Sequence, residues 1–209
     1  SGGGTSCLAT TTSAPSEQLL RTLEGLARAS RQSDPQGAQI LGVHLEGPFL
    51  NRDFRGVHVE RYIRQPKEGE LRAIWDAAGD ALKIVTLAPE VPGGEGALAF
   101  FVSHGVQVSL GHTGASYDDA RVALARGATR GTHVFNGMPP LHHRHPGPVG
   151  ALLEAGSYLE VIVDGHHLHF STVAMLVRLA GPDRVVAITD ATDVSGQGEG
   201  TFRRWEGTT

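Results

Sequence analysis

Short apolar runs recur along the chain and indicate buried strands. Seven of them are rich in Val, Ile and Leu and alternate little between apolar and polar positions: residues 5–11, 40–45, 83–88, 106–110, 129–135, 159–163 and 184–189. Parallel strands that are covered on both faces have this pattern. The run over 129–135 shows this apolar pattern least clearly, because Arg130 and Gly131 interrupt the run.

Helices are predicted between these strands. Ser16, Ser116 and Ser171 are suited to begin three of them, because a serine hydroxyl can accept a hydrogen bond from the first turn of a helix. Gly127 and Gly181 stand where two of these helices are expected to stop. Further helices are expected over residues 68–78, 97–104 and 149–155.

The repeated order of strand and helix predicts a parallel sheet, either an open doubly wound sheet or a (β/α)₈ barrel. The sequence has neither of the glycine-rich phosphate loops that mark many doubly wound sheets. Polar residues stand at the C-terminal ends of five of the strands, and in a barrel those strand ends meet at one mouth. These residues are Glu46, His112, His133, Asp164 and Asp190. We therefore predict that residues 1–209 form one partial α/β domain, a TIM-like (β/α)₈ barrel with seven visible strands.

Glu46, His112 and His133 form a ligand set that suits a metal ion. Two imidazoles and one carboxylate can hold zinc and leave a fourth position for water. His112 and His133 are one strand-to-strand repeat apart, which places them on neighbouring strand ends. Each residue alone is explained more simply as an isolated polar side chain on a loop. Three of them at corresponding strand ends favour a metal site.

Most of the other polar residues have two interpretations. Asp190 could take a proton from water and return it to a leaving amine, or it could cap a helix. His167 could point into the barrel mouth or cover its rim, and Asp164 is interpreted as a turn or orienting residue. Arg144 lies in a histidine-rich segment that could bind an anion, although a solvated loop is the simpler interpretation. His44 is interpreted as a packed interior histidine.

Composition narrows the class of protein. The chain carries 18 Lys and Arg against 22 Asp and Glu, a net charge of −4, and this balance argues against a nucleic-acid-binding protein. No apolar stretch approaches the length of a membrane span, and no signal peptide is visible. The single cysteine, Cys7, allows no internal disulfide and fits a reducing compartment. We therefore expect a cytoplasmic protein that binds neither nucleic acid nor membranes.

Six motifs resemble those of one known family. In chain order they are GVHLEGPFL at 42–50 with GVH at 56–58, LGHT at 110–113, GTHVFNGM at 131–138, RHPG at 144–147, DGHH at 164–167 and TDA at 189–191. They are similar to motifs of the N-acetylglucosamine-6-phosphate deacetylases, in the amidohydrolase superfamily. The resemblance covers the chain from Thr5 to about Gly200. It implies the barrel without its first strand and without the flanking β-sandwich, because the H-x-H motif and the sandwich have no counterpart here.

The resemblance implies a role for each candidate residue. Glu46, His112 and His133 would hold one Zn²⁺ per chain, Asp190 would be the catalytic acid and base, and His58 would polarise the acetyl carbonyl. Substrate contacts are implied for Val57, His58, Asn136, Gly137, Arg144 and His167.

Within that set, Arg144 and His167 would hold the 6-phosphate. The family counterpart of Arg144 reaches into the neighbouring subunit, so a homodimer is implied. Gly137 stands where the family usually has Ala, and His145 where it usually has Glu.

The predicted activity is metal-dependent hydrolysis of N-acetylglucosamine 6-phosphate to glucosamine 6-phosphate and acetate. One alternative is another amidohydrolase on the same barrel, a cyclic amidase or a deaminase. Another is a truncated relative that binds a metal or ligand without catalysis. A protein nucleophile is not expected, because the sequence has no G-x-S-x-G motif and no neighbour of Cys7 in sequence would activate its thiol.

Overall fold

The computed structural model describes residues 4–32, 37–192, 195, 203–204 and 207–208. Seven parallel strands form one sheet, and each pairs with its neighbours in chain order. They are β1 (Ser6–Thr11), β2 (Gln39–Glu46), β3 (Leu82–Leu87), β4 (Gln107–Leu110), β5 (Ala128–Gly131), β6 (Tyr158–Ile162) and β7 (Val185–Ile188). The order never reverses, which identifies a barrel-type sheet and not a doubly wound one.

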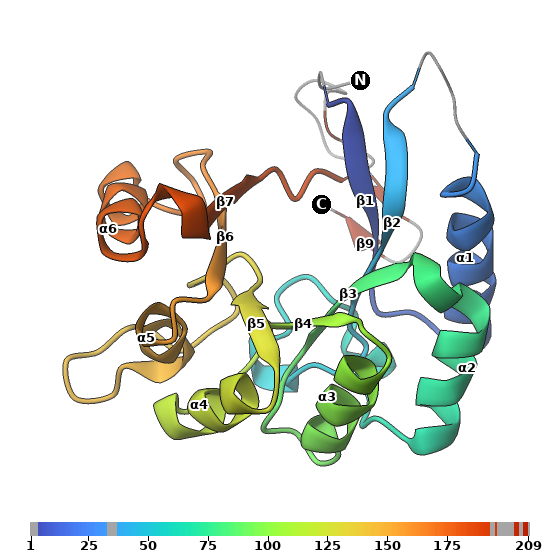
Figure 1. Cartoon of the computed structure of the whole chain (residues 1–209), viewed down its shortest axis with the longest axis horizontal. Helices are drawn as coiled ribbons and strands as arrows, with labels where there is room; N and C mark the ends of the chain where they lie inside the picture. The colour runs from blue at the N-terminus through green and yellow to red at the C-terminus, as the bar shows by residue number, and fades with distance from the viewer. Residues whose placement is uncertain (1–3, 33–36, 193–194, 196–202, 205–206, 209) are drawn as a thin grey trace.

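The sheet is curled into a partial barrel, with β1 and β7 at its two unpaired ends (Figure 1). Six α-helices of the described chain lie along its convex side: α1 (Ser16–Ala29), α2 (Glu68–Ala78), α3 (Gly94–Ser103), α4 (Tyr117–Ala125), α5 (Gly147–Glu154) and α6 (Phe170–Ala180). Short 3₁₀ helices are η1 (Arg52–Phe54), η2 (Glu60–Tyr62), η3 (Gly79–Ala81) and η4 (Pro182–Arg184), and β8 (Arg203–Arg204) pairs with β9 (Gly207–Thr208). Within the described residues, no helix is both long and apolar enough to span a bilayer.

The hydrophobic core lies between the sheet and the helices. Leu19, Leu23 and Ala27 of α1 are buried in it together with Val43 and Leu45 of β2. Alternate strand residues face the other side of the sheet, the barrel interior.

That interior carries polar side chains. His44 is buried there, as predicted, and its Nε2 lies 2.7 Å from the Thr86 hydroxyl, which lies 2.7 Å from the Thr132 hydroxyl. The middle strands are therefore buried on both faces, with apolar residues toward the helices and hydrogen-bonded polar residues toward the interior. The end strands β1 and β7 are not, because most of their residues are exposed or only partly buried.

Several predicted helix ends are confirmed. Ser116 and Asp119 form a complete capping box at the start of α4, and Gly127 follows the end of that helix with φ +109°. Gly181 closes α6.

Other local predictions are wrong in detail. The strand predicted over 129–135 ends at Gly131, because the chain then turns and His133 adopts φ +30°. Pro15, and not Ser16, precedes α1, and the Ser16 hydroxyl donates to Glu70 Oε1 at 3.1 Å. α6 begins one residue before Ser171.

Candidate metal centre and its cavity

The curvature of the sheet brings three predicted ligands together. Glu46 ends β2, while His112 and His133 stand two residues beyond the last residues of β4 and β5. All three side chains are buried, and one ligand atom from each lies within 4.8 Å of the others. His112 Nε2 is 2.9 Å from Glu46 Oε1, and His133 Nε2 is 3.3 Å from the same oxygen. The two Nε2 atoms are 3.1 Å apart. Residues distant in sequence thus form one compact cluster.

The hydrogen bonding of His112 shows that this cluster fits a cation. Its Nδ1 lies 2.8 Å from the backbone carbonyl oxygen of Phe54. A carbonyl oxygen only accepts, so Nδ1 carries the hydrogen and Nε2 of the neutral ring presents a lone pair. That lone pair faces a carboxylate oxygen and a second imidazole nitrogen. A divalent metal ion held by these three residues would satisfy all three atoms, and the outer hydrogen bond to Phe54 is the kind that metal-binding histidines commonly make.

Electrostatics in the cluster are dominated by Glu46. Burial would raise the pKa of its carboxyl group, but hydrogen bonds from His112, His133 and His58 hold that pKa well below its ordinary value. Burial likewise lowers the pKa of His133, but the hydrogen bond and charge of Glu46 outweigh burial and raise it. Without a metal, Glu46 therefore favours a proton on the His133 ring. A metal ion would replace that proton.

His58 approaches the same carboxylate from another loop. Its Nε2 lies 3.5 Å from Glu46 Oε1. The backbone N–H of Ser13 donates to its Nδ1 at 3.3 Å, and the Ser13 and Thr12 hydroxyls lie 3.0 and 3.1 Å from that nitrogen. Because Nδ1 accepts a backbone N–H, Nε2 of the neutral ring carries the hydrogen. His58 therefore presents an N–H donor toward the cluster.

A cavity of about 570 Å³ opens above the cluster. Most residues predicted for the site line it: Glu46, Val57, His58, His112, His133, Asn136, Gly137, His167 and Asp190. Its wall also includes Thr10, Thr11 and Thr12, which the sequence analysis missed. Their position at the end of the first strand, like that of the other polar residues, is the signal that could have identified them.

Three residues of the cavity have unfavourable backbone conformations. His112, His133 and Asp190 have φ values of +48°, +30° and +48°, and each stands two residues after a strand. Such conformations cost on the order of 1–3 kcal/mol each for residues other than glycine, and they persist only where surrounding contacts enforce them. The strand ends are thus shaped to aim these side chains at the cavity.

Asp164 orients His167, in agreement with its interpretation as an orienting residue. Its Oδ2 accepts a hydrogen bond from His167 Nδ1 at 2.7 Å, and its Oδ1 accepts the backbone N–H groups of His166 and His167, each at 2.8 Å. These hydrogen bonds hold the pKa of the Asp164 carboxyl well below its ordinary value. They also fix the ring of His167, which leaves its Nε2 available to a ligand.

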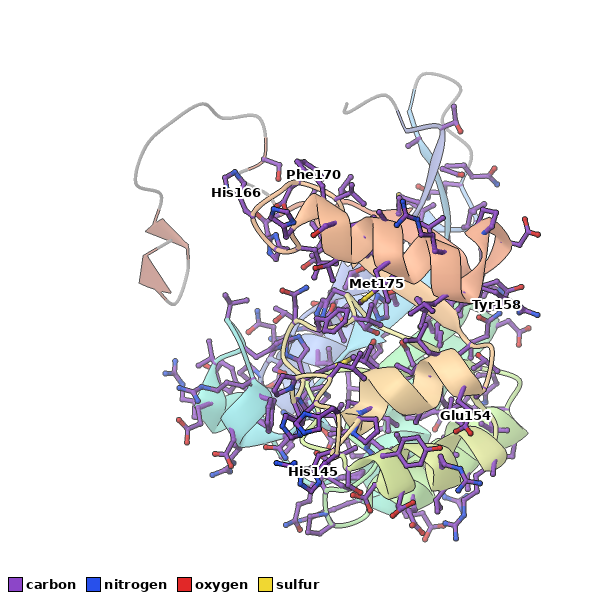
Figure 2. All side chains as sticks on the ribbon, turned by 90° about the vertical axis from the view of Figure 1, so that its left-hand side faces the viewer. His145, Glu154, Tyr158, His166, Phe170 and Met175 are labelled. Carbon is purple, nitrogen blue, oxygen red and sulfur yellow. The ribbon has the colours of Figure 1, made fainter. Side chains whose placement is uncertain are left out.

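Arg144 is the one predicted site residue that does not line this cavity. It is exposed in the loop before α5. Figure 2 shows His145, the neighbour of Arg144, well apart from His166, the neighbour of His167. Within the described chain, the two residues expected to hold a phosphate therefore do not converge.

Comparison with known proteins identifies the chain's relatives. The amidohydrolase family model matches residues 1–204. N-acetylglucosamine-6-phosphate deacetylase of Vibrio furnissii is 38% identical over 96% of this chain and 50% of its own length. N-acetylgalactosamine-6-phosphate deacetylase of Escherichia coli O157:H7 is 36% identical over 94% of this chain and 52% of its own length.

A solved structure agrees with these matches. It is an aspartate-to-alanine mutant of the Mycobacterium smegmatis N-acetyl-D-glucosamine-6-phosphate deacetylase in complex with N-acetyl-D-glucosamine-6-phosphate. It superimposes with a TM-score of 0.90 at 40% identity, over 96% of this chain and 52% of that one. The chain spans about half the length of the relatives it matches.

Proposed function

Since this chain belongs to the amidohydrolase family, we propose that it hydrolyses the N-acetyl group of N-acetylglucosamine 6-phosphate, giving acetate and glucosamine 6-phosphate. The observation that carries the proposal is the buried cluster of Glu46, His112 and His133 at the base of a cavity lined by His58 and Asp190. The similarity to named deacetylases supports the choice of substrate.

Glu46, His112 and His133 would hold one divalent ion per chain, and Zn²⁺ suits two imidazoles and one carboxylate. When bound, such an ion lowers the pKa of water and polarises a carbonyl oxygen. The protein aims the Nε2 lone pair of a neutral His112 at the ion through the hydrogen bond between its Nδ1 and the Phe54 carbonyl oxygen. Burial of the cluster strengthens these electrostatic interactions.

Asp190 and His58 would carry the proton and the developing charge. The Asp190 carboxylate would accept a proton from the attacking water and deliver it to the nitrogen of the departing amino sugar. His58, with its hydrogen on Nε2, would donate to the oxygen of the acetyl carbonyl as negative charge develops there. Asn136 and Gly137 would contact the substrate through main-chain groups, and Val57 would contact it at the cavity rim, where its side chain is 87% exposed.

His167 would bind the 6-phosphate from within the cavity, with its ring held by Asp164. Arg144 would supply the second contact from a neighbouring subunit, so the working form would be a homodimer. This arrangement accounts for the position of Arg144 outside the cavity of its own chain. A phosphorylated sugar and a single free cysteine, Cys7, fit a cytoplasmic enzyme.

Product analysis tests the proposal. The zinc-loaded chain is incubated with N-acetylglucosamine 6-phosphate, and acetate and free amine are quantified. The galactosamine isomer, a cyclic imide and an aminopurine serve as competing substrates. We expect equal amounts of acetate and amine from an acetylated amino-sugar phosphate and no turnover of the imide or purine. Turnover of the imide or purine alone contradicts the proposal, as does bound zinc without turnover of any substrate.

A further inference from the structure

We propose that Glu90 is a positioning residue that holds the metal ligand His112 in place by tying together the loops after β2 and β4. The inference rests on the proposed function in one respect, namely that His112 binds a metal. Glu90 stands three residues beyond the end of β3, the strand between β2 and β4 in the sheet. It belongs to none of the motifs singled out in the sequence.

The Glu90 carboxylate accepts hydrogen bonds from both neighbouring loops. Its Oε1 accepts the backbone N–H of Gly114 at 2.5 Å and the side-chain amide of Asn51 at 2.9 Å. Its Oε2 accepts the hydroxyl of Thr113 at 2.5 Å. Hydrogen bonds to an ionised acceptor are shorter and stronger than those between neutral groups. One side chain therefore connects the loop after β2 to the two residues that follow His112.

The loops after β2 and β5 hold the backbone around His112. The backbone N–H of Asn51 donates to the His112 carbonyl oxygen at 2.9 Å, and the backbone N–H of Thr113 donates to Gly137 O at 3.0 Å. His112 itself has φ +48°, a conformation that must be enforced by its surroundings. Glu90 contacts Asn51, which bonds the His112 carbonyl oxygen, and also Thr113 and Gly114, which follow His112, so it is placed to enforce that conformation.

Packing at Gly114 supports a close approach of the two loops. A Cβ atom at this position would lie 2.8 Å from Asn51 Nδ2 and 2.9 Å from Phe54 Cε2, which is closer than Cβ atoms approach other heavy atoms in proteins. Phe54 also supplies the carbonyl oxygen that fixes the ring of His112. The absence of a side chain at Gly114 lets its backbone N–H reach Glu90 while Phe54 stays in place.

These contacts predict an effect on metal affinity. Loss of the Glu90 carboxylate would leave the Gly114 N–H and the Thr113 hydroxyl without their acceptor and would free the peptide of His112. Changes to residues that orient a metal ligand typically cost about 10–100-fold in metal affinity. We expect a loss in that range for Glu90→Ala. We expect a smaller loss for Glu90→Gln, because its amide oxygen can still accept two hydrogen bonds.

The test measures zinc affinity by competition with a chromophoric chelator, together with the visible absorption spectrum of the Co²⁺-loaded protein and the melting temperature. Glu95→Ala is the matched control, since Glu95 is exposed on α3 and pairs with Arg126. Thr113→Val removes the hydroxyl that donates to Glu90 and keeps the shape of the side chain. This variant tests the same contact if Glu90→Ala does not fold. We expect weaker zinc binding and an altered Co²⁺ spectrum in Glu90→Ala and Thr113→Val, partial rescue in Glu90→Gln, and no change in Glu95→Ala.

Affinity and spectrum that match the wild type in the folded Glu90 and Thr113 variants overturn the inference and leave the proposed function standing. So does a lower melting temperature with unchanged zinc affinity, because the role of Glu90 would then be only structural. A wild-type chain that binds no divalent metal overturns the proposed function and this inference together.

Discussion

His112 Nε2 lies 2.9 Å from Glu46 Oε1, although 66 positions separate the two residues in the chain. Glu46 ends β2 and His112 stands two residues after β4, and these strands do not pair directly because β3 lies between them. The curvature of the sheet closes that gap and lets the side chains meet over the end of β3. With its other nitrogen bonded to the Phe54 carbonyl oxygen, a neutral His112 directs a lone pair at a carboxylate. This relationship is the strongest structural argument for a metal ion at the site.

Removal of either histidine ligand is expected to remove most of the metal. His112→Ala or His133→Ala leaves two protein ligands, which seldom hold zinc. The loss of affinity is expected to exceed the roughly 10–100-fold typical of residues that only orient a ligand. Elemental analysis after dialysis provides the measurement, and His143→Ala, at an exposed histidine, is the control. Near-normal zinc in both ligand variants would show that the ion is held elsewhere.

Asp190→Asn is expected to separate catalysis from metal binding. The amide preserves the shape of the side chain but cannot shuttle a proton. Turnover is therefore expected to fall by about 10²–10⁴-fold or more, the range usual for general acid–base catalysis. Zinc content is expected to stay near that of the wild type. The rate of acetate release and the zinc content of the same sample are compared, and an active Asp190→Asn variant is incompatible with the assigned role.

Zinc binding is expected to release a proton and to strengthen as pH rises. In the metal-free protein, Glu46 raises the pKa of His133 above its ordinary value of 6.5. Below that raised pKa, zinc must displace the His133 proton, and above it the ring is already neutral, so affinity increases with pH through this range. Calorimetric titrations in two buffers of different ionisation enthalpy measure the number of protons that are released when zinc binds. Identical heats in the two buffers below pH 6.5 count against this expectation.

Arg144→Ala is expected to impair recognition of the phosphate alone. A charge-assisted hydrogen bond contributes roughly 1.5–3 kcal/mol, which corresponds to about a 10–100-fold increase in KM for the phosphorylated sugar. The weak activity expected on unphosphorylated N-acetylglucosamine should barely change. Arg144 lies outside the cavity of its own chain. Mixing the Arg144→Ala chain with an inactive Asp190→Asn chain therefore tests whether Arg144 acts in the cavity of the neighbouring subunit. Equal losses on both sugars would assign Arg144 to the fold or to the dimer.

Much of the fold could be predicted from the sequence because strands that are buried on both faces are apolar runs. The parallel sheet and the strand ends that carry Glu46 and His112 follow from such runs. The end of β5 does not, because residues 132–135 are apolar enough to continue the strand. The turn that aims His133 at the cavity is held by backbone hydrogen bonds from Thr132 to Leu110 O and from Val134 to Glu160 O, which local propensity does not encode.

In the candidate site, too, some residues could be predicted from the sequence and others depend on contacts that only the folded chain makes. Glu46, His112 and His133 could be predicted because they occupy equivalent strand ends. Glu90 could not, since a single acidic residue in a loop has no sequence signature and its partners lie on two other loops. The tautomers of His112 and His58 likewise depend on backbone groups that only the folded chain brings close.

Titration of the metal-free protein with zinc, with acetate release from N-acetylglucosamine 6-phosphate measured at each step, tests the central claim most directly. The site of Glu46, His112 and His133 predicts a rate that rises in proportion to added zinc and reaches a plateau at one equivalent per chain. The same titration of His133→Ala is expected to give almost no activity at that ratio. Acetate release that is independent of zinc, or that needs two equivalents, would contradict the account.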